Sequence, residues 1–136
     1  MFLLDTVIVS EIRRKQPDSG VIEWVSRQPG NQLYLSVVTL GEIERGIERR
    51  RKSEPEFAQA LAAWLESLTL LYADRILPIT PAIARSWGRL SAKIGNDSAD
   101  LLIAATGLAH HLTVVTRNVS HFEPTGIAIV NPFSKP

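Results

Sequence analysis

The feature that most constrains this fold is an alternation along the chain between short apolar runs and longer segments of helical periodicity. The short runs have the length and composition of buried strands, while the segments between them repeat their apolar residues with the period of an α-helix. Such alternation is typical of βαβ units arranged around a parallel sheet. The expected strands cover residues 2–4, 33–36, 76–79, 113–116 and 127–130.

Two of the expected helices carry recognisable start and stop signals. Residues 53–56, Ser-Glu-Pro-Glu, combine a capping box with a proline near the first helical position. Thr80-Pro81 opens a second helix, and Gly95 is placed to end it in the left-handed conformation. The first of these helices should present an apolar face made of Phe57, Leu61, Trp64, Leu65, Leu68 and Leu71.

Further helices are expected over residues 7–13, 20–27, 40–51 and 98–111. The chain has no internal repeat, low-complexity tract or linker. Its 136 residues fit one domain with a real hydrophobic core. The sequence therefore predicts a single α/β domain over residues 1–136, with a central parallel sheet of about five strands flanked by helices.

Composition excludes several classes of function. The formal net charge is only +1, so any contact with a nucleic acid must come from a local patch. The chain has no cysteine, which excludes disulfides, thiolate zinc sites and cysteine nucleophiles, and suits a reducing cytoplasm. The longest apolar run, residues 101–109, is too short to cross a bilayer, and no targeting segment is recognisable. We expect a soluble, cytoplasmic protein.

Acidic and polar residues follow the expected strands at their carboxyl ends, where open parallel sheets bind ligands. Asp5 follows the first strand, Glu42 lies early in the helix after the second, and Thr116 and Asn118 end the fourth. Asp100 opens the helix that leads into the fourth strand. Three carboxylates sharing one cleft would repel each other unless a cation neutralised them. Because all the candidate ligands are hard oxygen donors, magnesium or manganese is favoured over zinc.

Each acid also has a purely structural interpretation. Asp5 could serve only as the N-cap of the next helix, and for Asp97 a capping role is preferred. Asp100 could also cap, but it heads the apolar run 101–105 and is therefore expected to point toward the interior. Glu42 alone would be interpreted as a solvated helix residue. The joint placement of the three acids is what favours a site.

Other conspicuous residues receive structural interpretations. The three histidines have no metal-ligand spacing and are expected to lie on the surface or to anchor loops: His110, His111 and His121. The basic run 49–52 ends a helix, where positive charge is favourable, so a solvated helix end is preferred to an RNA contact. The tryptophans lie on apolar stripes and are expected in the core: Trp24, Trp64 and Trp87.

Four stretches resemble the PIN-domain ribonucleases, in particular the VapC- and FitB-like toxins of bacterial type II toxin–antitoxin pairs. The opening FLLDT, with Ser10-Glu11, resembles the first acidic motif of that family, and VVTLGEIERGI at residues 37–47 resembles the second. The run NDSADLLIAATGLAHHLTVVTRNVSHF resembles the third acidic motif, followed by the strand and turn that contain Thr116 and Asn118. The resemblance spans nearly the whole chain.

The resemblance implies specific roles for the residues that match. Asp5, Glu42 and Asp100 match the acids that hold the metal, Thr116 matches a polar residue that fixes the metal-bound water, and Asn118 occupies a fourth, often acidic, position. The sequence departs from the family there, because Asn118 is neutral, and also at residue 7, where a valine stands in place of a frequent asparagine. The neutral Asn118 argues against tight binding of a second metal.

The implied activity is that of a Mg²⁺- or Mn²⁺-dependent endoribonuclease that acts as the toxin of a VapBC-like pair. The expected substrate is single-stranded or looped RNA, and in-line attack of an activated water would leave a 5′-phosphate. The resemblance also implies a homodimer and a larger assembly with a DNA-binding antitoxin, whose tail enters the acidic cleft.

Three other functions compete with this interpretation. The nearest is a weakly active or inactive PIN module that serves mainly as partner of a DNA-binding antitoxin in an autorepressor complex. A phospho-acceptor receiver domain would need paired acids after the first strand and a lysine after the last, whereas the chain has Leu4-Asp5-Thr6 and Asn131-Pro132 there. A dinucleotide-binding domain would need a Gly-x-Gly-x-x-Gly turn, which is absent.

Overall fold

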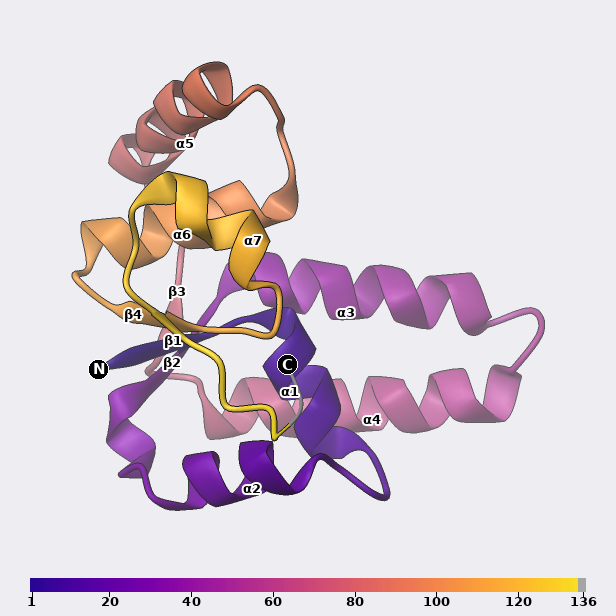
Figure 1. The fold of residues 1–136 in the computed structure, drawn as a ribbon. Helices are drawn as coiled ribbons and strands as arrows, with labels where there is room; N and C mark the ends of the chain where they lie inside the picture. The colour runs from indigo at the N-terminus through magenta and orange to yellow at the C-terminus, as the bar shows by residue number, and fades with distance from the viewer. Residues whose placement is uncertain (135–136) are drawn as a thin grey trace.

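The protein is described by a computed structural model that covers residues 1–134. Its strands form one parallel sheet in the order β3-β2-β1-β4-β5 (Figure 1). Two strands have the expected bounds, and the other three are shorter than expected. One cause is Pro78, which follows β3 and cannot donate to a sheet ladder. The strands are β1 (Phe2–Leu4), β2 (Leu33–Ser36), β3 (Ile76–Leu77), β4 (Thr113–Val115) and β5 (Ile129–Val130).

The six expected helices are all present, and the structure adds a short seventh. They are α1 (Thr6–Arg13), α2 (Ser19–Ser26), α3 (Val37–Arg50), α4 (Pro55–Leu71), α5 (Pro81–Ile94), α6 (Ala99–Ala109) and the added α7 (Val119–Phe122). Helix α3 begins three residues before the expected start because Ser36 caps it, accepting a hydrogen bond from the Val38 backbone N–H at 3.0 Å. Within residues 1–134, no helix combines the length and the apolar character that crossing a membrane requires.

The helix caps confirm one sequence interpretation and correct two. Thr80 caps α5 through the Ile83 N–H, and Gly95 ends it with a φ of 92°. The capping box expected before α4 is wrong, because its N-cap is Glu54 and makes no side-chain capping bond. The capping role expected for Asp97 is also wrong. Helix α6 begins one residue later than that role requires, after Ser98, whose N–H is accepted by the side chain of Asn96.

Side chains on opposite faces of the sheet enter two separate hydrophobic cores. Leu4 and Val115 belong to the larger core, shared with α1, α2, α3 and α4. Leu3 and Val114 belong to the smaller one, shared with α6 and with Phe122 of α7. In Figure 1, α5, α6 and α7 accordingly lie above the sheet, while α1 and α2 lie below it. The sheet is therefore buried on both faces, as all-parallel sheets require.

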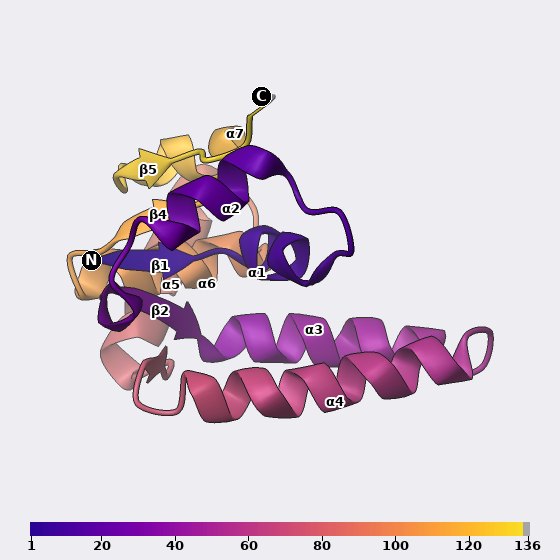
Figure 2. The same cartoon turned by 90° about the horizontal axis from the view of Figure 1, so that it is seen from below.

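Helices α3 and α4 form an antiparallel hairpin that extends beyond the edge of the sheet (Figures 1 and 2). Ile43 and Ile47 of α3 are buried in the larger core together with residues of α4. Leu71, which was expected on the apolar face of α4, is 67% exposed because it lies at the end of that helix. The hairpin supplies one wall of the candidate site.

The tryptophans are only partly placed as expected. Trp24 and Trp64 are half-buried and pack against the larger core, and the ring of Trp24 meets that of Phe2 edge-on at 4.9 Å. Trp87 is half-buried on α5, where its indole N–H is buried without a hydrogen-bond partner.

Candidate active site

Adjacent strands bring Asp5 and Thr116 together at the carboxyl edge of the sheet. Asp5 follows β1 and Thr116 follows β4, and the Asp5 N–H donates to the Val115 carbonyl at 2.9 Å. The Thr116 hydroxyl donates to Oδ2 of Asp5 at 2.8 Å and accepts from the Asn118 N–H at 2.9 Å. Because the chain turns to opposite sides of β1 to form β2 and β4, these residues lie where parallel α/β sheets bind ligands.

Asp5 caps a helix and also belongs to the acidic centre, the group of carboxylates formed by Asp5, Glu42 and Asp100. Its Oδ1 accepts from the Thr6 N–H at 2.8 Å and caps α1, while its Oδ2 faces Thr116. The side chain is buried, and this burial is the main reason why its pKa is raised to about 6. The bond from Thr116 lowers the pKa, the negative charge of Asp100 raises it, the Thr6 N–H lowers it, and Glu42 raises it. Asp5 can therefore cap α1 and still serve as a candidate metal ligand.

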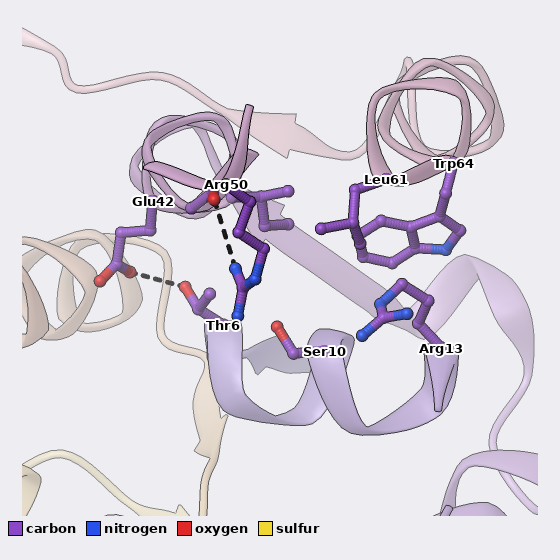
Figure 3. Close-up of a pocket in the computed structure, with 9 residues that line it drawn as sticks. Thr6, Ser10, Arg13, Glu42, Arg50, Leu61 and Trp64 are labelled. Atoms are coloured by element: carbon purple, nitrogen blue, oxygen red, sulfur yellow. Dashed lines mark hydrogen bonds between the residues drawn. The ribbon is translucent and has the colours of Figure 1, made fainter. Parts of the chain in front are cut away.

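Glu42 extends from α3 toward the start of α1, where it contacts Thr6. The Thr6 hydroxyl donates to Oε1 of Glu42 at 2.6 Å (Figure 3) and lies 2.9 Å from the hydroxyl of the fully buried Thr39. On the outer side, the guanidinium of Arg45 lies 3.9 Å from Oε2. Glu42 is thus held by specific contacts rather than solvated freely.

Asp100 lies in the first turn of α6 and contacts a histidine that sequence reasoning did not assign to the site. Its Oδ2 is 2.7 Å from Nδ1 of His121, which α7 carries. The Asp100 side chain is 18% exposed and that of His121 is 58% exposed. The interior orientation expected for Asp100 is therefore only partly correct, since it remains open at the rim. His121 is on the surface, as expected, but it also orients an acid of the centre.

Three further residues complete the description of the centre. Asn118 occupies the N-cap position of α7, yet its side chain makes no capping bond and only its backbone N–H is engaged. Thr6 and Thr39 were not singled out from the sequence, although a signal existed. Thr6 directly follows Asp5. Thr39 precedes Glu42 by three positions, so Thr39 and Glu42 lie on the same face of α3.

The acidic centre has the donor chemistry for a hard cation but does not present a ready-made ligand cluster. In the part of the chain that the structure describes, no three His, Cys, Asp or Glu side chains converge closely enough to hold a metal ion. Glu42 and Asp100 are nevertheless close enough to Asp5 to raise its pKa. A buried carboxylate with acidic neighbours is stabilised by a divalent cation. The chemistry of the donors therefore suits such an ion, while the arrangement of the described side chains does not bring three of them together.

Hollows adjoin the centre on both sides. A cavity of about 190 Å³ begins at Thr6 and Glu42 and runs between α1 and the α3–α4 hairpin (Figure 3). A more open hollow of about 400 Å³ begins at Asp100 and His121 and includes the exposed Asp97. The acids thus lie between two surfaces on which an extended ligand could bind.

Comparisons with known proteins agree with this geometry. The family model described as "PIN domain" matches residues 2–124. The chain is 36% identical to the VapC ribonuclease Y4jK of Sinorhizobium fredii, over 98% of each chain. It is 33% identical to toxin FitB of Neisseria gonorrhoeae, over 98% of this chain and 99% of that one. The crystal structure of FitAcB from the same organism superimposes with a TM-score of 0.85, at 33% identity, covering 97% of this chain and 98% of the other.

The expected parallel sheet, the order of the motifs and the family match agree over nearly the whole length of the sequence. The relatives named as a ribonuclease and as a toxin match end to end rather than through one shared motif. The chain belongs to the PIN domain family.

Proposed function

We propose that this protein is a metal-dependent endoribonuclease and the toxin of a VapBC-like toxin–antitoxin pair. The observation that carries the proposal is Asp5, a buried carboxylate whose pKa is raised to about 6 and which lies beside two other acids at the carboxyl edge of the sheet. A purely structural cap gains nothing from such neighbours, whereas a catalytic metal centre needs them. The ribonuclease and toxin names of two full-length relatives support the same activity.

Asp5, Glu42 and Asp100 would hold Mg²⁺ or Mn²⁺, because all three are carboxylates and no thiolate is present. The bound ion would lower the pKa of a water molecule and neutralise charge on the scissile phosphate. Hydrolysis, in which a water oxygen bonds to phosphorus and the P–O3′ bond breaks, would leave a 5′-phosphate on one product and, after the 3′-oxygen takes up a proton from the water, a 3′-hydroxyl on the other.

The remaining residues of the centre keep these carboxylates in place. Thr116 donates to Asp5, which favours its ionised form and fixes its orientation. Thr6 holds Glu42, and His121 holds Asp100. Asn118 lies beside Thr116 with its amide group unengaged by the helix cap, so the amide would be available to donate to a phosphate oxygen.

The proposed partners are an RNA substrate, a DNA-binding antitoxin and a second copy of the chain. An antitoxin is supported by the relative named toxin FitB. Ile43 and Ile47 of α3 are buried within the chain and leave no apolar surface for a second copy. Leu70 and Leu71 at the end of α4 support self-association, since they are 78% and 67% exposed.

The decisive test is RNA cleavage by the protein freed of antitoxin. Labelled single-stranded RNA should be cut with Mg²⁺ or Mn²⁺ and not in excess EDTA, and the products should carry 5′-phosphates. Asp5→Asn, purified in the same way, is the matched inactive control. Unaltered cutting in excess EDTA, or equal cutting by the control, would refute the proposal.

An inactive PIN module acting in an autorepressor complex is the second candidate. Two observations favour it: Asn118 is neutral, and no three His, Cys, Asp or Glu side chains of the described residues come close enough together to hold a metal ion. The same assay separates the two functions. A parent protein that cuts no RNA with either ion, yet still tightens the binding of its antitoxin to operator DNA, would support the second candidate.

A further inference from the structure

The cavity beside Thr6 and Glu42 contains two arginines that enter it from different helices. Arg13 lies at the end of α1, and Arg50 lies at the end of α3. Figure 3 shows both guanidinium groups directed into the space above Ser10. Two positive charges therefore approach one small volume next to an acidic centre.

No carboxylate within residues 1–134 lies within ion-pair distance of either arginine, although their sequence neighbours are paired. Arg14 pairs with Glu11, and Arg51 pairs with Glu48. Isolated like charges in a cavity repel each other, and an anion between them removes that repulsion. Glu42 also lines the cavity but lies outside ion-pair distance of either arginine, so both guanidinium groups remain available to an anionic ligand.

Aromatic stacking holds the two arginines in this orientation. The guanidinium of Arg13 lies 5.3 Å from the ring centre of Phe57 and 5.9 Å from that of Trp64. The guanidinium of Arg50 lies 5.5 Å from the Phe57 ring centre, and its Nη1 donates to the Gly46 carbonyl at 3.2 Å. Stacking of this kind orients a guanidinium while leaving most of its N–H donors free for a ligand. Stacking therefore restricts the orientation of both guanidinium groups, although Arg13 is half-buried and Arg50 is exposed.

We propose that Arg13 and Arg50 form a phosphate-binding subsite for the RNA strand that passes through the active site. The inference rests on the proposed ribonuclease function. A phosphodiester fits the pair because guanidinium groups match its oxygens in a forked geometry. The Ser10 hydroxyl, which lines the same cavity, supplies a further donor.

The subsite binds a phosphate other than the scissile one. Arg13 follows Asp5 by eight positions along α1, which corresponds to about 12 Å of helix. Thr6, which follows Asp5, and Arg13 line the same cavity. With a net charge of only +1, the chain depends on such local patches to bind RNA. The proposal gives Arg50 a role in binding phosphate, whereas the basic run 49–52 as a whole was expected to be a solvated helix end.

The first test compares two double variants that lose the same charge. Arg13→Gln/Arg50→Gln should raise KM for RNA cleavage by roughly tenfold to a hundredfold and change kcat little, because the contact is made equally in the ground and transition states. The slope of log affinity against log salt should become shallower by about 0.7, as for the loss of one phosphate contact on a single strand. Arg85→Gln/Arg89→Gln on α5 is the control and should behave like the parent protein.

The second test locates the bound phosphate. It uses RNAs in which one phosphate at a time is replaced by a neutral methylphosphonate, and the affinity of the protein for each RNA is measured in EDTA. The parent protein should lose affinity at one position outside the scissile bond, and the Arg13→Gln/Arg50→Gln variant should show no further loss there. Arg13→Lys/Arg50→Lys keeps the charge but not the fork, so it should have an intermediate KM. This variant decides the matter if the glutamine variant fails to fold.

Three results would overturn the inference while leaving the proposed function intact. The first is a parent that cuts RNA while the arginine variants keep its KM. The second is equal sensitivity of parent and variant to every methylphosphonate. The third is unchanged RNA binding combined with weakened binding of the antitoxin, which would assign the pair to a protein carboxylate. A parent protein that cuts no RNA would instead refute the proposed function.

Discussion

At the scale of single residues, Asp5 connects helix formation to chemistry. One of its oxygens caps α1 and the other accepts from Thr116, so the same side chain begins a helix and fixes the acidic centre. Its sequence position, directly after an apolar strand, made the capping role predictable, while its role as a metal ligand stays a prediction. The contact of His121 with Asp100 was not predictable in the same way, because it depends on α7, a helix of four residues with no periodicity to reveal it.

The raised pKa of Asp5 predicts how pH acts on the metal-free protein. Its folded value of about 6 exceeds the usual 3.8, so the folded state binds the proton more tightly than the unfolded state does. The contribution of Asp5 to stability is therefore most favourable below about pH 4 and declines as pH rises to about 6. Asp5→Asn removes this decline, so its free energy of unfolding should gain on the parent by up to about 3 kcal/mol over that interval. Urea unfolding in EDTA from pH 4 to pH 7.5 measures the difference, and a difference independent of pH would contradict the prediction.

Thr116 should be needed for both stability and activity. Thr116→Val keeps the shape but leaves Oδ2 of Asp5 and the Asn118 N–H without a partner, which should cost about 1–3 kcal/mol of stability. Loss of the hydroxyl also raises the pKa of Asp5 further and should reduce metal-dependent cleavage at neutral pH. Thr116→Ser keeps the hydroxyl and is the control. Equal unfolding midpoints and rates for the two variants would show that the hydroxyl is dispensable.

Asp100→Asn distinguishes a metal ligand from a helix cap. The substitution removes a charge that opposes ionisation of Asp5 and loses only a contact with the exposed His121, so the metal-free protein should be as stable as the parent or more stable. RNase activity should disappear. The stabilisation by Mg²⁺ should also disappear, which for the parent is about 2.7 kcal/mol at a hundred times the dissociation constant. Thermal melting of both proteins with EDTA and with Mg²⁺ gives the answer. A lower melting temperature in EDTA with an unchanged Mg²⁺ shift would make Asp100 a structural residue.

At the scale of elements, the start of α2 is fastened to the end of the chain. Asp18 accepts from the Ser134 N–H at 3.0 Å and from the Ser134 hydroxyl at 2.7 Å. Gly20 lies against the same segment, and a Cβ on it would come within 2.5 Å of the Pro132 carbonyl and 2.7 Å of the Ser134 N–H. These contacts with backbone atoms cannot be relieved by moving a flexible side chain.

Two glycine substitutions in helices should therefore have opposite effects. Gly20→Ala should destabilise the protein by about 1–3 kcal/mol through overpacking. Gly88→Ala, in α5 with nothing within 4 Å of the added Cβ, should stabilise it by up to about 1 kcal/mol through helix propensity. Urea unfolding of both variants makes the comparison. Equal effects would mean that the C-terminal segment does not pack on α2 as described.

The elements also show what local sequence could and could not predict. Helix α5 was predictable at both ends, because Thr80 and Gly95 make their capping contacts within the helix itself. The start of α4 was not, because a Ser-x-x-Glu pattern permits a capping box without requiring one, and Glu54 became the cap. Strand ends were the least predictable, since each depends on which neighbour pairs with it across the sheet.

At the scale of the whole molecule, the alternating pattern predicted the parallel sheet, and the family match confirms the fold class. The order of the strands then brings Asp5 and Thr116 together, so this part of the centre followed from topology. The metal site remains a prediction. The cavity containing Arg13 and Arg50 could not be foreseen, because it depends on how the α3–α4 hairpin packs against α1.

Self-association is the prediction that belongs to this scale. Light scattering at micromolar concentration should give a mass of twice 15.1 kDa, because the adjacent Leu70 and Leu71 are 78% and 67% exposed and offer apolar surface that a second copy would cover. Leu70→Gln/Leu71→Gln should shift the equilibrium toward the monomer. Ile22→Gln, at a residue 40% exposed on α2, is the control and should leave the equilibrium unchanged. A parent protein that remains monomeric would contradict the prediction.

The separation of Asp5 and Thr116 by 111 residues has a consequence for synthesis on the ribosome. The central strand β1 is translated first, yet β4, its neighbour on one side, arrives only after most of the chain. At about 5–20 residues per second, roughly 5–20 s pass between the two residues. No nascent chain that ends before Thr116 can complete the acidic centre. Translation itself therefore delays the appearance of the complete acidic centre. Under the proposed function, an antitoxin would be required only when the last part of the chain emerges.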